Sequence, residues 1–319
     1  MDDYANDILP GFITKVRPVL EELEEQRKHN LKKTAFLTVS IAILTSIVVL
    51  FIPTSAKFYA VAFSVFLIFL SMLISSSFGR RELDSKYKEL VVKKMVEQVN
   101  DENIACEYSR NGCANIDTFR RSSLFSQHPS ERLSSEDSFC GRVGNSAFAF
   151  CEAKYSYCEE CQDKEREKEV VLFQGIQFEA DFNKNFNGKT LVTHFCPEGV
   201  SYSRFKKVKN LENTEFCKKF SVYSTNDIEA RYILSPALQE RILSLNDSFV
   251  SNSITRNHLK ISFFENRIFI LIPSSKNNFE ASFFKRMDET RVGSDYRVIT
   301  SLISIIEELN LNTRIWTKE

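Results

Sequence analysis

The chain has 319 residues with 42 basic and 42 acidic side chains, so its formal net charge is zero and its sequence pI is about 6.9. It lacks the basic excess with which nucleic-acid-binding proteins neutralise phosphates, and we expect no nucleic-acid partner. The mean hydropathy of −0.23 is that of a polar chain, but it conceals a strongly apolar N-terminal region.

Two apolar runs, residues 35–52 and 58–78, follow each other with only a short turn between them. At about 1.5 Å rise per residue, each run would extend roughly 27–31 Å as a helix, which matches the hydrocarbon core of a bilayer. We therefore predict a transmembrane helical hairpin at residues 35–78, with the lipid bilayer as its partner. The alternative, a hairpin buried in a soluble protein, would need a very large core. Neither run contains Asp, Glu, Lys, Arg or His, which disfavours an ion pathway.

Lysine and arginine crowd both outer flanks of this hairpin, whereas its turn has only Lys57. Because basic residues resist translocation, both termini are predicted to be cytoplasmic. All eight cysteines follow the second run, so their thiols are expected to stay reduced. A cleaved signal peptide is disfavoured by the acidic start, Met1-Asp2-Asp3, and by the length of the first run. The flanking basic residues are Lys15, Arg17, Arg27, Lys28, Lys32 and Lys33 before the hairpin, and Arg80, Arg81, Lys86, Lys88, Lys93 and Lys94 after it.

Small residues recur at every fourth position inside both apolar runs. They are Thr38, Ala42 and Ser46 in the first run, and the pairs Ala60 and Ser64, and Ser71 and Ser75, in the second. This spacing lets helix backbones approach closely in lipid. Two interpretations stay open: the two helices pack on each other, or the chain forms a homo-oligomer through one of these faces.

Helical periodicity flanks the hairpin on both sides, over residues 16–33 and 80–99, and the two helices could pair as an antiparallel stalk. We expect the C-terminal domain to fold without its anchor. The predicted organisation is a cytoplasmic N-terminal helix (1–34), the transmembrane hairpin (35–78), a juxtamembrane helix (79–100) and a soluble domain (101–319).

The soluble domain starts with residues 101–142, whose weak periodicity and isolated apolar residues predict a segment that lies along the domain surface and is not a pure linker. Strand patterns then dominate, and the charged residues 158–169 are predicted to form a hairpin loop between two strands. The predicted strands are 146–153, 170–182, 190–195 and 216–223.

Helical patterns follow these strands at 227–233 and 236–245, and a closing helix is predicted at 298–309. Between them, residues 259–264 and 267–272 predict a β-hairpin. Strands and helices are clustered and do not alternate, which is typical of an α+β domain with a mainly antiparallel sheet and packed helices.

Cys158 and Cys161 have the Cys-x-x-Cys spacing of half a zinc site. His194 and Cys196 alternate on a predicted strand, face the same way, and would complete a Cys₃His set. The charged residues around the cysteine pair instead favour a solvated loop, so we expect no bound metal and no other cofactor. A thioredoxin-type site is disfavoured further, because no βαβ pattern accompanies the pair.

No catalytic motif stands out: a P-loop, Gly-x-Gly-x-x-Gly, Gly-x-Ser-x-Gly and His-Glu-x-x-His are all absent. Cys217 could pair with His194 or His258, but eight cysteines and four histidines offer such pairs by chance. Glu229 and Arg231 lie two residues apart on a predicted helix and do not face each other. Their charges either pair within the domain or form a recognition surface. We assign no catalytic residue.

Long phrases of the C-terminal half are distinctive: Phe173-Gln174-Gly175, then residues 180–190 (ADFNKNFNGKT), 220–224 (FSVYS), 229–238 (EARYILSPAL) and 305–316 (IIEELNLNTRIW). These phrases, and the two-span N-terminal hairpin, resemble the bacterial membrane family Domain of Unknown Function 3137. The resemblance implies an inner-membrane protein with a soluble C-terminal domain. It implies no activity and no catalytic residues.

Together these patterns favour a membrane-anchored protein whose soluble domain binds an unidentified protein partner or scaffolds an assembly. The alternative is a membrane-tethered enzyme whose site is assembled from residues scattered along the chain. A deep polar cleft with perturbed titratable groups would favour the enzyme. An exposed apolar patch or an open sheet edge would favour binding.

Overall fold

The structure is a computed structural model, and it contains two compact units that are each built from two segments of the chain. Unit 1 holds residues 1–95 and 278–296, and unit 2 holds residues 96–277 and 297–319. The region expected as a single domain from residue 101 therefore contributes a segment to the unit that contains the apolar helices. The structure describes residues 2–160, 167–182, 185–194, 204–251, 254 and 258–309.

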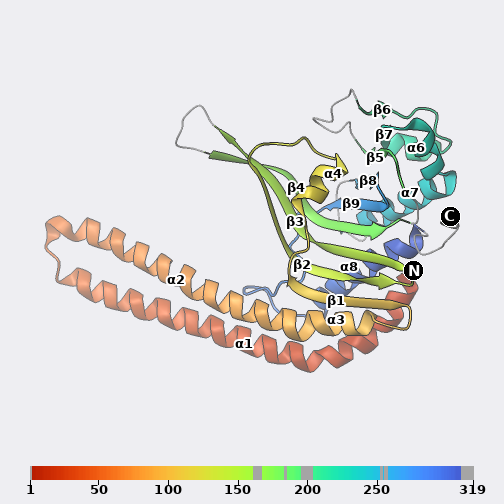
Figure 1. The fold of residues 1–319 in the computed structure, drawn as a ribbon. Helices are drawn as coiled ribbons and strands as arrows, with labels where there is room; N and C mark the ends of the chain where they lie inside the picture. Colours follow the sequence, from red (N-terminus) through yellow and green to blue (C-terminus); the bar gives the residue numbers. More distant parts are fainter. Residues whose placement is uncertain are drawn as a thin grey trace. The chain divides into compact units, whose positions relative to one another are not determined.

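Two long helices run side by side in unit 1 (Figure 1). Helix α1 covers Asp2–Leu50 and helix α2 covers Lys57–Tyr87, joined by a 3₁₀ turn, η1, at Thr54–Ala56. The N-terminal helix and the first apolar run are one continuous helix, because no proline or glycine occurs between residues 19 and 50. A π-helical turn, η2 (Lys88–Val92), then leads from α2 into α3 (Lys93–Val99).

The apolar parts of α1 and α2 are uncovered. Their most apolar 18-residue windows have mean hydropathies of 2.0 and 2.3, and only 6% and 0% of those residues are buried. A core helix of a soluble protein would bury such side chains against the rest of the fold. The structure therefore shows two helices that are long and apolar enough to cross a membrane and that expose their apolar side chains.

Most of the small residues lie on the face where α1 and α2 approach each other. Thr38, Ala42 and Ser64 are half-buried there, whereas Ser46 is exposed. The hydroxyl of Thr34, just before the first apolar run, lies 2.8 Å from that of Ser75 across the hairpin. Packing within the hairpin thus occupies these positions, as expected for close approach of two helices in lipid.

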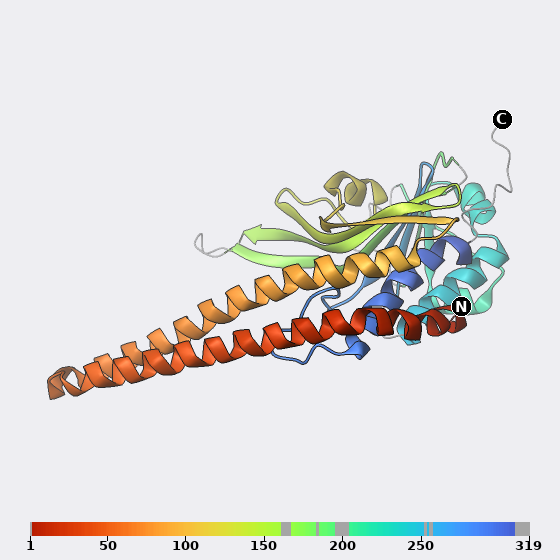
Figure 2. The same ribbon diagram turned by 90° about the horizontal axis from the view of Figure 1, so that it is seen from below.

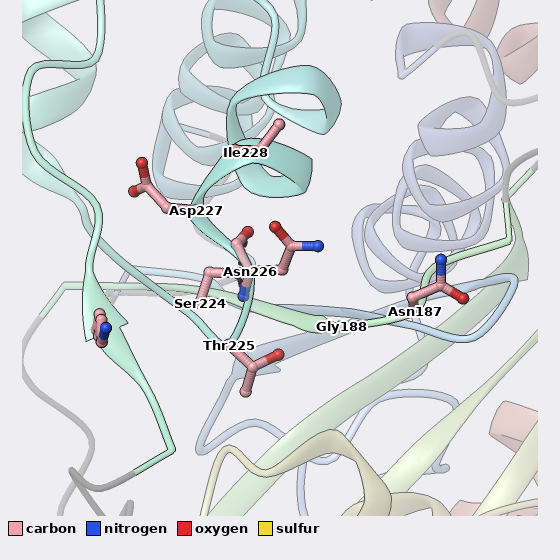
Figure 3. A pocket seen from close by; sticks show the side chains of 8 residues that line it. Asn187, Gly188, Ser224, Thr225, Asn226, Asp227 and Ile228 are labelled. Carbon is pink, nitrogen blue, oxygen red and sulfur yellow. Dashed lines mark hydrogen bonds between the residues drawn. The ribbon is translucent and has the colours of Figure 1, made fainter.

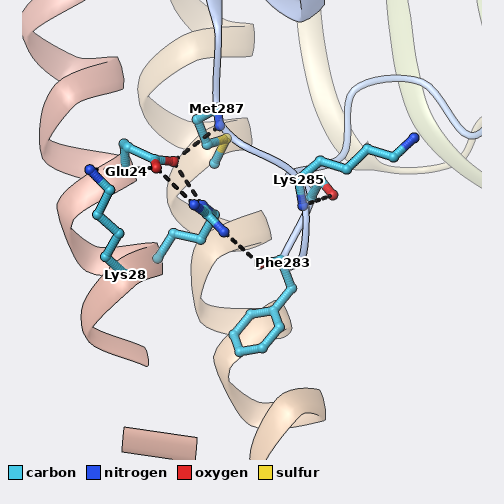
Figure 4. Close-up of polar contacts among 7 residues, drawn as sticks. Glu24, Lys28, Phe283, Lys285 and Met287 are labelled. Carbon is cyan, nitrogen blue, oxygen red and sulfur yellow. Dashed lines mark hydrogen bonds and ion pairs between the residues drawn. The ribbon is translucent and has the colours of Figure 1, made fainter. Parts of the chain in front are cut away.

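Residues 278–296, here called the strap, pack against the helices of unit 1 around a buried ion pair (Figure 4). Arg27 donates to both carboxylate oxygens of Glu24, at 2.7 and 2.8 Å, and to the carbonyl of Phe283 at 3.2 Å. Glu24 also accepts the backbone N–H of Met287 at 3.1 Å. The side chains of Glu24 and Arg27 are only 10% and 9% exposed. Hydrogen bonding to Arg27 lowers the pKa of Glu24 to about 2.

The rest of the strap is fastened by packing and by a second buried hydrogen bond. The hydroxyl of the fully buried Tyr87 donates to Asp295 at 2.7 Å. The ring of Phe283 lies so close to α2 that a Cβ added at Gly79 would come within 2.6 Å of it. The strap is therefore part of the core of unit 1, although it is remote from the helices in sequence.

Unit 2 is built around a nine-stranded sheet with the order β1-β2-β3-β4-β9-β8-β5-β7-β6. All pairings between these strands are antiparallel, which confirms the predicted α+β class. The strands are β1 (Ile104–Asn111), β2 (Glu131–Val143), β3 (Ser146–Glu160), β4 (Glu167–Asp181), β5 (Lys189–Thr193), β6 (Lys206–Lys207), β7 (Ser221–Ser224), β8 (Lys260–Phe264) and β9 (Arg267–Pro273).

Helices cover both faces of this sheet. They are α4 (Ile116–Ser122), α5 (Thr214–Lys219), α6 (Asp227–Ile233), α7 (Pro236–Ser251) and residues 297–308 of α8 (Glu289–Glu308). Figure 2 shows α4 on one face and this part of α8 on the other. Successive side chains of a strand point to opposite faces, so a strand covered on both sides has a continuous apolar sequence. Strand β9 is such a strand: Ile268, Phe269, Ile270, Leu271 and Ile272 are each 0% exposed.

No strand or helix was predicted within residues 101–142, but this segment forms β1, α4 and β2. Strand β1 lies at the end of the sheet and buries only Cys106 among its side chains. A strand that buries so few residues leaves almost no alternating pattern in the sequence, which is why its periodicity is weak.

Two further elements differ from their predictions. Cys158 lies in β3 and pairs with Glu169 of β4, because both strands extend into the charged segment that was predicted to be a loop. Residues 216–223 were predicted to be one strand but form the end of α5 and then β7. Asn213 caps α5 by accepting the N–H of Phe216 at 3.0 Å, and Phe216 and Phe220 are one helical turn apart.

Candidate functional site

A polar pocket of about 500 Å³ lies in unit 2, beside the start of α6 (Figure 3). Three segments form it: the residues before β5, strand β6, and the connection between β7 and α6. Pairing of β7 with both β5 and β6 brings these segments together. The lining residues are Asn187, Gly188, Lys206, Ser224, Thr225, Asn226, Asp227 and Ile228.

The connection from β7 to α6 is held by local hydrogen bonds. The side chain of Asn226 accepts the N–H of Glu229 at 3.2 Å and so caps α6, as asparagine commonly does. The hydroxyl of Ser224 accepts the N–H of Asn226 at 3.1 Å and donates to the carbonyl of Lys189 at 3.0 Å. The sharp turn at the pocket wall is therefore encoded by its own polar side chains.

A carboxylate from α6 ties the segment before β5 to this helix. Glu229 accepts the backbone N–H of Asn187 at 2.9 Å and that of Gly188 at 2.8 Å. Lys189 donates its N–H to the hydroxyl of Thr225 at 2.9 Å. A Cβ at Gly188 would lie 2.8 Å from both the Glu229 carboxylate and the Thr225 hydroxyl, so a larger residue here would have to displace these side chains.

The described residues that line the pocket include no cysteine or histidine. The Ser224 hydroxyl among them is already bonded to backbone. Lys206 and Asp227 present opposite charges at exposed positions. Ile228 at the rim is 81% exposed, and Tyr232 one turn later is 53% exposed. Polar groups beside exposed apolar side chains are typical of a surface that contacts another protein.

Residues 171–311 match the family described as "Protein of unknown function (DUF3137)". The family resemblance seen in the sequence is confirmed over this segment, and every pocket-lining residue lies within it.

One solved structure is similar to this chain, the crystal structure of the mycobacterial trehalose monomycolate transport factor A, TtfA. The TM-score is 0.35 at 10% sequence identity, and the match covers 72% of this chain and 97% of that chain. No curated protein sequence matches the chain.

The sequence candidates for a zinc site are not brought together where the structure describes them. Cys158 lies on β3 and His194 directly follows β5, and three strands separate β3 from β5 in the sheet. At about 4.8 Å per strand the separation is roughly 19 Å. Cys161 and Cys196 lie outside the described residues. Within the described part of the chain, no three His, Cys, Asp or Glu residues form a group that could hold a metal ion.

The proposed cysteine–histidine pair has other partners in the structure. The thiol of Cys217 on α5 contacts the carbonyl oxygen of Leu211 at 3.9 Å. His194 bonds through Nδ1 to the carbonyl of Lys219 at 2.6 Å, and its ring lies 4.1 Å from that of His258. Burial lowers the pKa of His258. The fold therefore pairs the two histidines with each other.

The charges on α6 pair within unit 2, which was the first of the two interpretations. Glu229 holds the segment before β5, and Arg231 donates to Asp227 at 3.0 Å and to the carbonyl of Asn210 at 3.2 Å. Reasoning from the sequence missed the pocket itself. Asn187, Gly188 and Ser224 were noted only as parts of family phrases, and only the pairing of β5 with β7 places those phrases side by side.

Proposed function

We propose that this chain is an integral protein of a bacterial inner membrane and that unit 2 binds a protein partner at the pocket beside α6. The exposure of the apolar hairpin is the observation that carries the anchoring. Burying one large apolar side chain contributes roughly 1.5–3 kcal/mol, and more than a dozen such side chains stand uncovered between Phe36 and Phe78. Lipid would cover them.

Both flanks of the hairpin are proposed to be cytoplasmic. The supporting observation is the charge asymmetry, with Lys57 alone in the turn and six basic residues on each flank. Unit 2 then lies in the cytoplasm, where its thiols are reduced at rest.

Thiol labelling in intact cells tests this orientation. Cys217 is exposed, so a membrane-impermeant maleimide should label it in inverted vesicles and not in cells whose inner membrane is intact. The variant Lys57→Cys should show the opposite pattern, and Lys33→Cys, on the N-terminal flank, is the matched control that should behave like Cys217. Labelling of Cys217 in intact cells would overturn the orientation.

The binding of a protein partner is supported by the pocket's chemistry. A partner segment would place an apolar side chain on Ile228 and an acidic group against the exposed Lys206, whereas Asp227 already pairs with Arg231. The Ser224 hydroxyl and the N–H groups of Asn187 and Gly188 are hydrogen-bonded within unit 2, so a partner would not have to displace them. Contacts of this mixed kind are common at transient interfaces.

Site-specific photocrosslinking in native membranes tests this interface. A photoreactive residue at position 228 should give one defined protein adduct, and a residue at position 250 should not, although Val250 on α7 is also exposed. Lys206→Glu should weaken the adduct at 228 at least several-fold by reversing the charge in the pocket. Equal adducts from both positions, or no effect of Lys206→Glu, would contradict the proposed site.

A further inference from the structure

Three cysteines from different elements meet in unit 2, outside the family-matched segment. Cys113 lies between β1 and α4, Cys140 is on β2 and Cys151 is on β3. The thiol of Cys113 lies close enough to the thiols of Cys140 and Cys151 for both of them to raise its pKa. All three are free cysteines, and strands β4, β9 and β8 separate them from the strands of the pocket.

A β-bulge in β2 places two of these thiols on one face of the sheet. Asp137, with a φ of +51°, and Ser138 together stand opposite Cys151, because the register shifts at this point. Next to the bulge, Cys140 pairs with Ala149. Ala149 and Cys151 are two residues apart on β3, so their side chains share a face. Cys140 and Cys151 therefore lie diagonally across two paired strands.

The link from β1 to α4 brings the third thiol over this face. The backbone approaches β2 so closely at Gly112 that an added Cβ would lie 2.0 Å from the Ser135 hydroxyl. The Cys113 thiol, and to a smaller extent the N–H groups of Cys113 and Ala114, lie close enough to the Cys151 sulfur to lower its pKa. Asn115 caps α4 by accepting the N–H of Asp117 at 2.8 Å. The position of Cys113 is thus held from both sides.

The three thiols differ in access and in acidity. Cys140 is exposed, Cys113 is half-buried and Cys151 is buried. The hydrogen bond from Cys113 lowers the pKa of Cys140 to about 7, and the pKa of Cys113 is raised because its proton serves this contact. Cys140 is therefore the accessible thiol with the greater thiolate fraction at neutral pH, and thiolates are the reactive form of cysteine.

We propose that Cys140 and Cys113 form a reversible disulfide when the protein meets a peroxide. Two adjacent thiols, one exposed and one behind it, are the arrangement in which an oxidised cysteine is resolved by a neighbour. The bond would join the link before α4 to β2. The inference does not depend on the proposed partner or on the membrane orientation.

The chemistry balances with a hydroperoxide as the oxidant. The Cys140 thiolate attacks one peroxide oxygen, the O–O bond breaks, and hydroxide leaves and takes up a proton to become water. Cys140 is then a sulfenic acid. Cys113 loses its proton and attacks the Cys140 sulfur, the S–S bond forms, and the S–O bond breaks with release of a second water. Two thiols are oxidised and one peroxide is reduced.

Peptide mapping of the full-length protein in detergent tests this site. Cleavage after lysine and arginine places the three cysteines on separate peptides, residues 111–120, 133–142 and 143–154. After stoichiometric hydrogen peroxide and alkylation, we expect a 111–120 peptide linked to a 133–142 peptide, with a mass lower by two hydrogen atoms. Dithiothreitol should restore both free thiols.

Variants distinguish the roles of the thiols. In Cys113→Ser, Cys140 should stop at the sulfenic acid and be trapped by dimedone, whereas Cys140→Ser should give no linked peptide. Cys217→Ser is the matched control, since Cys217 is also exposed and should leave the linkage unchanged. The proposal fails if Cys140 stays reduced while Cys217 is oxidised. It also fails if the linked peptide contains Cys151 in place of Cys113.

Discussion

Replacing Glu24 with glutamine should loosen the strap from the helices of unit 1. The carboxylate is 10% exposed and bonds to Arg27 and to the N–H of Met287. Its pKa falls from an ordinary 4.5 to about 2, which corresponds to roughly 3 kcal/mol at about 1.4 kcal/mol per pKa unit. Removing one partner of a buried ion pair costs about 3–5 kcal/mol of stability, which agrees with the value from the pKa shift.

Hydrogen exchange of the full-length protein in detergent measures this effect at the strap. A loss of about 3 kcal/mol should reduce the protection of the Met287 amide roughly 100-fold. The matched control is Glu22→Gln, because Glu22 is exposed on the same helix and accepts a hydrogen bond from the Gln26 amide at 3.2 Å. Glu22→Gln should change the free energy of opening at the Met287 amide by no more than about 0.5 kcal/mol.

The pH dependence gives a second, independent readout of the same contact. The folded-state pKa of Glu24 is depressed, so its stabilisation is fully present above about pH 4.5 and is lost as pH falls toward 2. Glu24→Gln should remove this component. The proposed role of Glu24 is refuted if the Met287 amide is as protected from exchange in Glu24→Gln as in Glu22→Gln. It is also refuted if the loss of protection at low pH is the same in Glu24→Gln as in the unmodified protein.

Three further predictions concern stability. Gly175 has a φ of +150°, and an added Cβ would come within 2.2 Å of the Ile272 carbonyl. Gly175→Ala should therefore lower the free energy of unfolding in urea by at least about 2 kcal/mol. Gly11 has open space around it, so the control Gly11→Ala should not lower the free energy of unfolding. Burial lowers the pKa of His258, so its contribution to stability is present above about pH 6.5 and is lost as pH falls. In His258→Asn the melting temperature should therefore fall less between pH 7 and pH 5 than in the unmodified protein. An unchanged dependence of melting temperature on pH would count against this. A fragment starting at residue 103 keeps every strand of unit 2 and lacks only the helices on which the strap packs, so it should still show a cooperative urea transition, and a gradual transition would count against independent folding of this part of the chain.

Much of the local structure was predictable because it depends on neighbouring residues. The apolar runs identified the helical hairpin from hydrophobicity and length alone. The β8–β9 hairpin was predicted with its bounds nearly correct, since two apolar strands flank a turn at Glu265 that adopts a φ of +56°. Helix α6 was predicted with the correct bounds from its helical pattern, and the structure shows that Asn226 caps it.

Long-range pairing decided what the sequence left open. The edge strand β1 was missed because it buries one side chain, and the strap joined unit 1 through contacts such as Met287 with Glu24, far away in sequence. The order of the strands set Cys158 and His194 far apart, although both had seemed available to one metal.

The sequence by itself determined the apolar helical hairpin, the α+β class and the family resemblance of residues 171–311, because hydrophobic length, periodicity and characteristic phrases are properties of contiguous residues. Only the tertiary structure decided the candidate sites. The pocket needs β7 between β5 and β6, and the thiol cluster needs a bulge in β2 and a link that crosses it. Such juxtapositions arise from the free energy of packing the whole sheet, which no short stretch of sequence encodes.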